Sequence, residues 1–590
     1  MVVRLFPRFR VIRTDRRLPG WLEAFRWGVT GLVFVAFALV VLVWGYRIEA
    51  MGVLRWLMNA LNPVVLSVTL VDVMLGFLFA PEFGTYVRRR WLDLALLIPI
   101  VAALVAGHSA LLLIALRQLI VLTQTFLRSR RFAGVIGEIR RRPIQLLAVS
   151  FILMIALGMV LLTLPVATAD GRGAPVIDAL FTSTSAVCVT GLIVRDTQFY
   201  WSHFGQWVIL VLIQFGGLGI MTFSASIIAL IGGRLGVYGR KTMGEVVEDS
   251  RDLDIAHSLR YILLFTLLAE ALGFVVLFLR WVGATTHPLE AAYNALFHSV
   301  SAFCNAGFSV FSTNLSAYPG DIIVNLTVIG LVLLGGLGFS VVHEVINRRN
   351  LRYLLDRVFR RPIAEPPQRL SVHAFLVLRT SAILVLAGTV LFFFFEYDNA
   401  LGPFSFGTKL LASLFQAITP RTAGFNTVPF DSLRPVTLFA ITILMFIGAS
   451  PGGTGGGIKT STLAVLFLTL RNLIVGSTEV EVRGRSLPRD TIRRATGIAV
   501  GAASVLSLIL GILLATERLP FANLLFETVS AFGTVGLTTG ATPLLSVPGK
   551  VSIIVLMYVG RLGPLTLALT IRARQARPAV QYPQTRVIVG

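Results

Sequence analysis

ALFTSTSAVCVTG (residues 179–191) is the first of four segments that share one pattern. The others are ALFHSVSAFCNAG (295–307), SLFQAITPRTAG (413–424) and LLFETVSAFGTVG (524–536). The interval from the phenylalanine to the closing glycine is ten residues in three segments and nine in the third. A helix of about ten residues rises about 15 Å, half a bilayer, so each segment can enter a membrane and return without crossing it. The pattern therefore predicts four re-entrant pore loops.

The composition indicates that these loops lie in a membrane. Of the 590 residues, 55% are hydrophobic and only 14% are charged, whereas a soluble chain carries about 25% charged residues. The net charge is +23, but the basic residues form short clusters between apolar runs, as cytoplasmic loops do. This distribution indicates membrane orientation and argues against nucleic-acid binding. The two cysteines, Cys188 and Cys304, are too few for a disulfide framework.

Apolar runs and arginine clusters together predict twelve spans, with both termini in the cytoplasm. The fold class that follows is an all-α polytopic membrane protein with four tandem membrane-pore-membrane units around one pseudo-fourfold pore. About four extra transmembrane helices precede these units. The predicted divisions are an N-terminal transmembrane extension (1–142), pore unit 1 (143–240), pore unit 2 (241–365), pore unit 3 with an intramembrane gate loop (366–485), and pore unit 4 with a cytoplasmic tail (486–590).

The four closing glycines predict an ion filter. Non-helical backbone at membrane depth must be shielded by protein or line a water-filled cavity, so four such loops require a shared pathway. Pore helices that end there direct the negative ends of their dipoles at the cavity, which favours a cation. A glycine can turn its carbonyl toward the axis, and rings of carbonyls replace a hydration shell. Glycine in close helix packing is the alternative for any single position, but four matching positions favour a filter. The predicted filter residues are Thr190, Gly191, Asn305, Ala306, Gly307, Ala423, Gly424, Val535 and Gly536.

A second glycine-rich segment, GASPGGTGGGIKT (448–460), interrupts the apolar stretch 438–470. So many glycines together with Pro451 cannot continue a regular helix in lipid, and the break would lie halfway across the membrane. The alternative is a phosphate-binding loop. An isoleucine before Lys459 departs from that motif, and no preceding strand is expected.

Arg561 lies within the last apolar span, 25 residues after Gly536. A charge there costs at least about 2.5 kcal/mol, so it should face a partner or a wet cavity. A structural pair with Glu270 or Glu527 is the alternative to a role beside the pore.

Three further groups of residues leave their roles open. Arg421 could be solvated, paired with Asp431, or part of the filter. Glu527, expected near the start of the fourth pore helix, could stabilise the helix N-terminus or attract ions. The two cysteines stand three residues before a glycine each and are expected to be packing residues and not metal ligands.

The motifs TGL (190–192), NAGF (305–308), RTAGFNT (421–427) and TVGLTTG (534–540) resemble those of the Trk/Ktr/HKT superfamily of potassium transporters, in particular the bacterial Trk/Ktr-type membrane subunit. The resemblance covers about residues 143–575. Glycine at all four filter positions is similar to the potassium-selective members, because sodium-selective plant relatives carry serine at the first. The resemblance implies that the glycine-rich segment obstructs the pore just below the filter and that Arg561 is an electrostatic barrier beside it. The gate residues would be Gly452, Gly453, Thr454, Gly455, Gly456, Gly457, Lys459 and Arg561.

This resemblance implies potassium uptake through a channel-like pore in the cytoplasmic (inner) membrane of a prokaryote. It also implies a homodimer, surrounded by membrane lipid and controlled by a separate cytosolic ring of Rossmann-type subunits that bind the nucleotide. No such domain, no enzyme constellation and no cofactor are expected in this chain, apart from potassium at the filter. The alternatives are a sodium-permeable or weakly selective transporter of the same superfamily, and a non-conducting receptor or scaffold. The four glycines and Arg561 favour conduction, and repeats that run in one direction argue against an alternating-access carrier.

Overall fold

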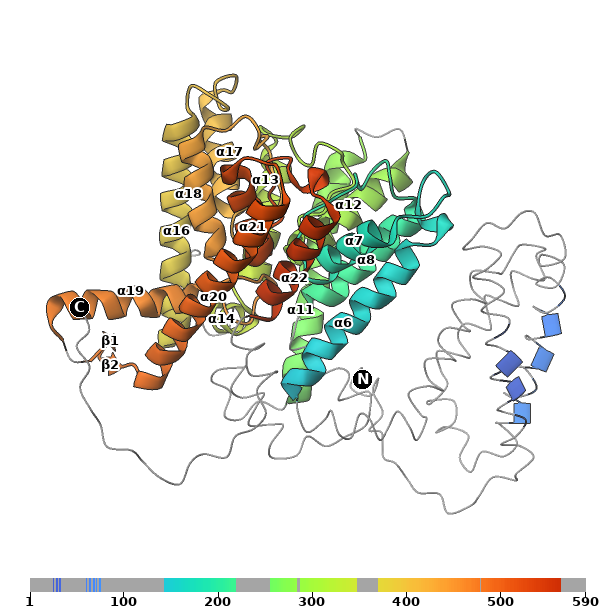
Figure 1. Ribbon diagram of the computed structural model, residues 1–590, viewed down its shortest axis with the longest axis horizontal. Coiled ribbons are helices and arrows are strands. Elements are labelled where there is room, and N and C mark those ends of the chain that lie inside the picture. The colour runs from blue at the N-terminus through green and yellow to red at the C-terminus, as the bar shows by residue number, and fades with distance from the viewer. Residues whose placement is uncertain are drawn as a thin grey trace, which may run out of the picture.

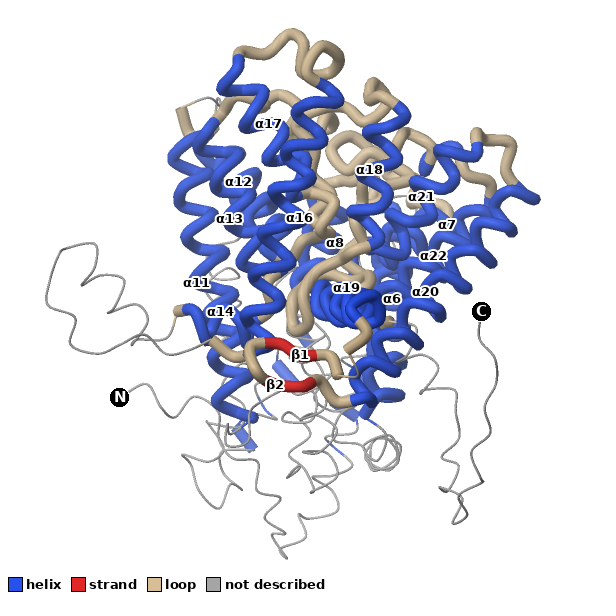
Figure 2. Tube along the Cα trace, turned by 90° about the vertical axis from the view of Figure 1, so that its left-hand side faces the viewer, coloured by secondary structure: helices blue, strands red, loops and turns tan. Residues whose placement is uncertain are grey.

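A computed structural model describes residues 143–218, 255–283, 287–346, 370–477 and 479–563, together with isolated helical positions before residue 76. The regular secondary structure of this part is almost entirely helical, with many of the helices running side by side (Figures 1 and 2). Apart from those isolated positions, the predicted N-terminal extension lies outside the described residues, and so does the basic cluster at 348–361.

In each predicted unit, a first helix is followed by a short helix and then by a further helix. The helices of the first two units are α6 (Pro143–Leu162), α7 (Val176–Val187), α8 (His203–Gly217), α11 (Ile255–Trp281), α12 (Pro288–Phe303), α13 (Ile322–Gly336) and α14 (Phe339–Val345). Those of the last two are α16 (Val372–Glu396), α17 (Phe406–Ile418), α18 (Pro435–Phe446), α19 (Thr460–Val475), α20 (Arg489–Thr516), α21 (Phe521–Gly533) and α22 (Val547–Leu562). The short elements are the 3-10 helices η2 (Pro165–Ala167) and η3 (Thr542–Leu544) and the antiparallel strands β1 (Glu481–Val482) and β2 (Arg485–Ser486).

Local sequence explains where several of these helices begin. Ser202, Asp321, Ser371, Ser405 and Ser546 each accept a hydrogen bond from the backbone N–H three residues later, which caps the free N–H groups of the first turn. A proline in the first turn of α12, α18 and α22 also suits a helix start, where its missing N–H costs nothing.

Three described helices are long and apolar enough to cross a membrane. They are α16, α20 and the part of α11 from Arg260 to Trp281. Each is the first helix of a predicted pore unit. The pair α13 and α14, bent by 108°, would be a fourth span if counted as one. The shorter apolar helices include α7, α8, α17, α18 and α19, together with Leu147–Leu162 of α6.

The contacts between units run in a cycle. The helix that follows each pore loop packs on the pore helix of the next unit: α8 on α12, α13 on α17, and α18 on α21. The last such helix, α22, packs on the first pore helix, α7. A large hydrophobic core includes Phe181, Phe297 and Phe425, and a second hydrophobic cluster, with Met445 and Phe526, lies between α18 and α21.

The predicted break in the apolar stretch 438–470 is confirmed. Helix α18 ends at Phe446, and α19 begins only at Thr460. In Figure 1, α19 extends crosswise to the upright helices α16 and α18 instead of continuing their direction. The glycine-rich segment is therefore a loop that turns the chain.

Candidate functional site

The four pore helices α7, α12, α17 and α21 end in the same backbone conformation. The residue two positions before each closing glycine has a positive φ: 57° at Val189, 59° at Asn305, 72° at Thr422 and 50° at Thr534. The glycines themselves have φ values of 88°, 70°, 74° and 87° in chain order. A left-handed β-branched residue is a clear outlier, and such strain persists only where the surroundings impose it. The repetition shows that the four segments follow one path, a feature that residue identity did not indicate.

Hydrogen bonds tie each segment to its own pore helix. Thr190 donates its backbone N–H to the Ser185 carbonyl (2.7 Å), and Ala306 and Val535 donate equivalently to the carbonyls five residues earlier (2.8 and 2.9 Å). In the third unit, Ala423 donates to the carbonyl four residues earlier, at Thr419 (2.9 Å). The third turn is thus one residue tighter, which accounts for its nine-residue interval.

The four glycines also approach one another in a cycle. A Cβ on Gly191 would collide with the Ala306 carbonyl oxygen, and one on Gly307 would lie 2.8 Å from the Gly424 Cα. A Cβ on Gly424 would lie 2.5 Å from the Val535 carbonyl oxygen, and one on Gly536 would collide with the Thr190 carbonyl oxygen. Glycine is required because the neighbouring backbone occupies the space of a side chain. All nine predicted filter residues are brought together here, and all are buried.

Side chains of the pore helices form hydrogen bonds with the glycine segments and with the residues that follow them. Ser185 accepts a hydrogen bond from the Gly191 N–H (3.1 Å), and Ser301 donates to the Phe308 carbonyl (2.7 Å). Glu527 is fully buried in the middle of α21, so its predicted position near the helix start is wrong. Its carboxylate accepts hydrogen bonds instead from the segment after Gly536, namely Thr538, Thr539 and Thr542.

The glycine-rich loop 447–459 lies against the ends of helices from two other units. Ser450 and Thr454 donate their backbone N–H groups to the carbonyls of Gly336 and Gly335 on α13, both at 3.0 Å. Gly457 donates to the Gly560 carbonyl on α22 (3.3 Å).

The same loop reaches the glycine ring. Gly456 donates its N–H to the Thr534 hydroxyl (2.9 Å), and a Cβ on Gly455 would collide with the Thr422 hydroxyl. Both threonines are left-handed residues that lead into the ring. The loop is therefore in direct contact with the third and fourth glycine segments.

Arg561 joins the loop to the first unit. Its guanidinium donates to the Thr454 carbonyl of the loop and to the Gly216 carbonyl of α8. Lys459 donates to the Gly455 carbonyl (2.6 Å) and so closes the loop on itself. All eight predicted gate residues thus lie in one cluster. Among the described residues, no ion pair joins Arg561 to Glu270 or Glu527, so that alternative is wrong.

Arg421 does not face outside water. Only 6% of its surface is exposed, and it donates to the Ser381 hydroxyl on α16 (2.8 Å). Asp431, the partner in one of the three alternatives for Arg421, is exposed. The tight turn of the third unit, with Pro420 in it, directs the arginine back toward α16.

The cysteines behave as packing residues. Both are fully buried and free, and a Cβ on Gly217 would collide with the Cys304 sulfur. Within the described ranges, no group of three or more His, Cys, Asp or Glu side chains is arranged to hold a metal ion.

One charged group escaped the sequence analysis. Asp178, in the first turn of α7, is nearly fully buried and forms ion pairs with Arg195 (2.8 Å) and with Lys550 of α22 (2.7 Å). Asp178 and Lys550 are 372 residues apart, so no local pattern could have indicated the pair. It lies where the first and fourth units meet.

Comparisons with known proteins identify the family and the fold. The family model described as TrkH, cation transport protein, matches residues 120–579. The chain is similar to Ktr system potassium uptake protein B of Bacillus subtilis, with 38% identity across 77% of this chain and 98% of that protein. It is also similar to the potassium/sodium uptake protein NtpJ of Enterococcus hirae, with 32% identity across 77% of this chain and 99% of that protein. Among solved structures, the potassium transporter TrkH of Vibrio parahaemolyticus shares the fold, with a TM-score of 0.60 and 20% identity over 82% of this chain and 96% of that one.

Proposed function

Because the chain belongs to the TrkH family of cation transport proteins, we propose that it carries potassium into the cell through a pore lined by its four glycine segments. The family consists of ion transporters and not enzymes, and this chain is a multi-pass membrane protein of that family. The relatives named potassium uptake proteins, in Bacillus subtilis and Vibrio alginolyticus, support potassium as the ion.

The observation that carries this proposal is the closed cycle of glycines and carbonyls. Each glycine leaves room for backbone of the next segment. The Ala306 carbonyl lies at Gly191, for example, and the Val535 carbonyl lies at Gly424. Four segments with one backbone path support a pseudo-fourfold pore made of the units 143–240, 241–365, 366–485 and 486–590. Their carbonyls would replace the hydration shell of a dehydrated cation.

The second part of the proposal is the gate. The loop 447–459 and Arg561 would obstruct the pathway on one side of the filter. The contacts of Gly455 and Gly456 with Thr422 and Thr534 support this location. The guanidinium is bonded only to carbonyl oxygens among the described residues, so its positive charge stays uncompensated by a carboxylate and would repel a passing cation.

The third part concerns the setting of the protein. We expect it in the inner membrane of a prokaryote, as a homodimer with both termini in the cytoplasm. The relatives in Bacillus subtilis and Vibrio alginolyticus are named as proteins of a Ktr system, which supports a separate regulatory subunit. A Rossmann-type ring that binds a nucleotide would be that partner.

A second candidate is a sodium-permeable transporter of the same family. This candidate is supported by the name of the Enterococcus hirae relative, which is a potassium/sodium uptake protein. A non-conducting receptor is the third candidate, and the intact glycine cycle argues against it.

Ion flux measured on the full chain in liposomes tests the proposal. We expect potassium-loaded vesicles to release potassium when the chain is present, with sodium unable to substitute for it in matched vesicles. Equal potassium and sodium flux would favour the second candidate. No flux above empty vesicles, with and without a regulatory subunit purified from the same cells, would contradict transport.

A further inference from the structure

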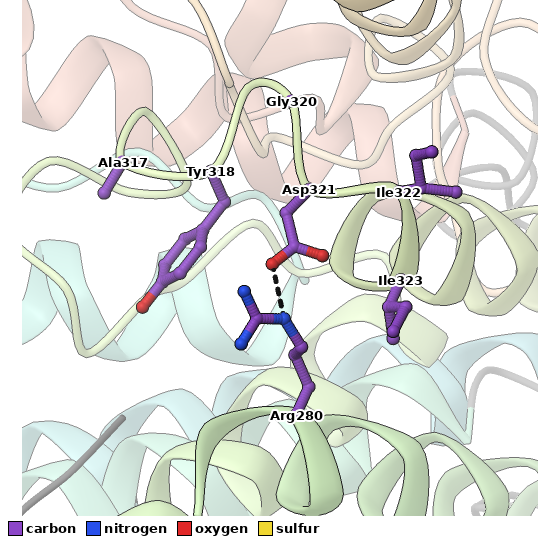
Figure 3. A pocket seen from close by; sticks show the side chains of 7 residues that line it. All are labelled: Arg280, Ala317, Tyr318, Gly320, Asp321, Ile322 and Ile323. Carbon is purple, nitrogen blue, oxygen red and sulfur yellow. Dashed lines mark hydrogen bonds and ion pairs between the residues drawn. The ribbon is translucent and has the colours of Figure 1, made fainter. Parts of the chain in front are cut away.

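A cavity of about 830 Å³ opens beside the end of α11 and the start of α13, lined by residues of neither the filter nor the gate loop (Figure 3). Its polar groups are the Arg280 guanidinium, the Asp321 carboxylate and the Tyr318 hydroxyl. Ile322 and Ile323 form its apolar side. The cavity is open to the surface, and it combines a few polar groups with an apolar wall, as small-molecule sites usually do.

The position of Arg280 along α11 places the cavity at a membrane surface. The apolar part of α11, Arg260–Trp281, has 22 residues and a length of about 33 Å, enough to cross the hydrocarbon core. Arg280 lies in its last turn, at the level of the lipid headgroups. Tyr318, which is half-buried and packs on the buried Trp281 with the ring centroids 5.9 Å apart, is of a residue type that concentrates at this level.

Exposed apolar side chains continue from the cavity toward the hydrocarbon region. Leu279, Ile322 and Ile323 are 67%, 63% and 49% exposed. In a membrane-spanning protein, such side chains face acyl chains. The cavity thus joins a polar pocket to a lipid-facing surface, as a phospholipid site must.

The charges of the cavity have a defined arrangement. Arg280 donates through Nε to Asp321 Oδ2 (2.7 Å), while Asp321 Oδ1 accepts the N–H of Val324 and caps α13 (3.1 Å). Holding the guanidinium through Nε leaves its two Nη groups directed toward the side of Tyr318 (Figure 3). The cavity therefore presents the Nη donors of Arg280 next to the Asp321 carboxylate, with which Arg280 is already paired.

We propose that this cavity binds the headgroup of a phospholipid that carries a phosphate and a primary ammonium group, as phosphatidylethanolamine does. The planar guanidinium suits two phosphate oxygens, and the ammonium finds its counter-charge at Asp321. A choline headgroup cannot donate hydrogen bonds to that carboxylate, and an anionic headgroup without an ammonium meets it as a like charge. The adjoining isoleucines favour a lipid over free phosphate.

Thermal unfolding of the full chain in detergent, with added lipids of identical acyl chains, tests this site. We expect phosphatidylethanolamine to raise the unfolding midpoint more than phosphatidylcholine or phosphatidylglycerol. Arg280→Gln should weaken phosphatidylethanolamine binding about tenfold, the equivalent of one charge-assisted hydrogen bond. Asp321→Asn keeps a helix cap and should abolish only the preference over phosphatidylcholine. Arg434→Gln, at an exposed arginine before α18, is the matched control and should change nothing.

Native mass spectrometry of the same variants separates the remaining outcomes. Retained lipid on the wild type and the Arg434→Gln variant, and its loss from Arg280→Gln, would support the site. If Arg280→Gln folds poorly, Arg280→Lys should retain lipid with reduced affinity. Equal binding of the three lipids, an equal loss in Arg434→Gln, or binding of inorganic phosphate alone would overturn the proposal. So would a change from dimer to monomer in Arg280→Gln without any lipid effect, because a second copy of the chain would then cover the cavity.

Discussion

The third pore unit differs from the other three in how its second helix meets its pore helix. In the first, second and fourth units, a glycine of the second helix packs on a carbonyl in the last turn of the pore helix: Gly216 on Val187, Gly335 on Phe303, and Gly560 on Phe532. In the third unit, α18 ends at Phe446 and the glycine loop takes this place. The chain thus repeats the glycine segment four times but departs from the repeat once, in the helix that follows the third segment. We infer that selection belongs to the repeated part and control to the unique part.

Neutralising Arg561 tests the unique part and should have the largest effect. A cation passing at about 6 Å meets a repulsion of roughly 3 kcal/mol at an effective dielectric near 20, equivalent to about a hundredfold in rate. Arg561→Gln should therefore raise potassium flux by up to about a hundredfold with unchanged selectivity, measured per inserted molecule in liposomes.

Arg421→Gln is the control that separates the effect of losing any buried arginine from the effect of losing the charge at Arg561. This arginine is as buried as Arg561 but bonds to Ser381 on α16, so its loss should lower stability without raising flux. A folded Arg561→Gln protein with equal or lower flux would remove the barrier role.

Serine at Gly191 or Gly307 tests the repeated part. The added side chain would meet the carbonyl of the next segment in a left-handed conformation, a strain of about 1–3 kcal/mol. We expect the preference for potassium over sodium to fall about tenfold, as reversal potentials in mixed salts would report. Gly407→Ser on α17 has open space and should keep the wild-type preference. Unchanged selectivity in both filter variants would exclude these glycines from ion selection.

Shortening the loop should have a smaller effect than removing the charge beside it. Deleting residues 452–457 removes the contacts with Thr422 and Thr534 and the Thr454 carbonyl that Arg561 binds, but it keeps the charge of Arg561 and its hydrogen bond to the Gly216 carbonyl. Potassium flux should rise and depend less on any cytosolic regulator, measured in the same vesicles. Lower flux from a protein that elutes as a folded species would mean that the segment supports the pore and does not obstruct it.

The ion pair between the first and fourth units should have the smallest effect, and on stability alone. Asp178→Asn leaves Lys550 and Arg195 without their carboxylate, but Arg195 is 45% exposed and can be solvated. We expect the free energy of unfolding to fall by about 1–3 kcal/mol and the midpoint of thermal unfolding in detergent to fall with it. Asp431→Asn, at an exposed aspartate, should leave the midpoint unchanged. A midpoint that falls equally in both variants would show that the Asp178 pair has no special part in joining the units.

The sequence was sufficient for features that depend on residue type and spacing. The four glycine segments, the broken apolar stretch and the family were predicted. A phenylalanine precedes the closing glycine by ten residues in three segments and by nine in the third, and a run of glycines cannot form a regular helix in lipid. The cyclic contacts and the left-handed threonines could not be predicted, because they depend on neighbours that are distant in the chain. A left-handed conformation is unfavourable for threonine, so the residue type at Thr422 and Thr534 predicts an ordinary negative φ instead. Glu527 and Arg421 were misplaced because their partners, Thr542 and Ser381, lie beyond any local pattern.

The seam between α7 and α22 has a consequence for how the chain could be connected. Linkers join the other neighbouring units, but here a packed interface and the Asp178–Lys550 pair hold two units together without a covalent link. The order in which the chain connects the four units is therefore one of several orders that would give the same ring. A circularly permuted chain, opened between the second and third units and joined across the seam, should assemble the same filter. Gene fusion or fission could have produced this protein without altering any contact around its axis.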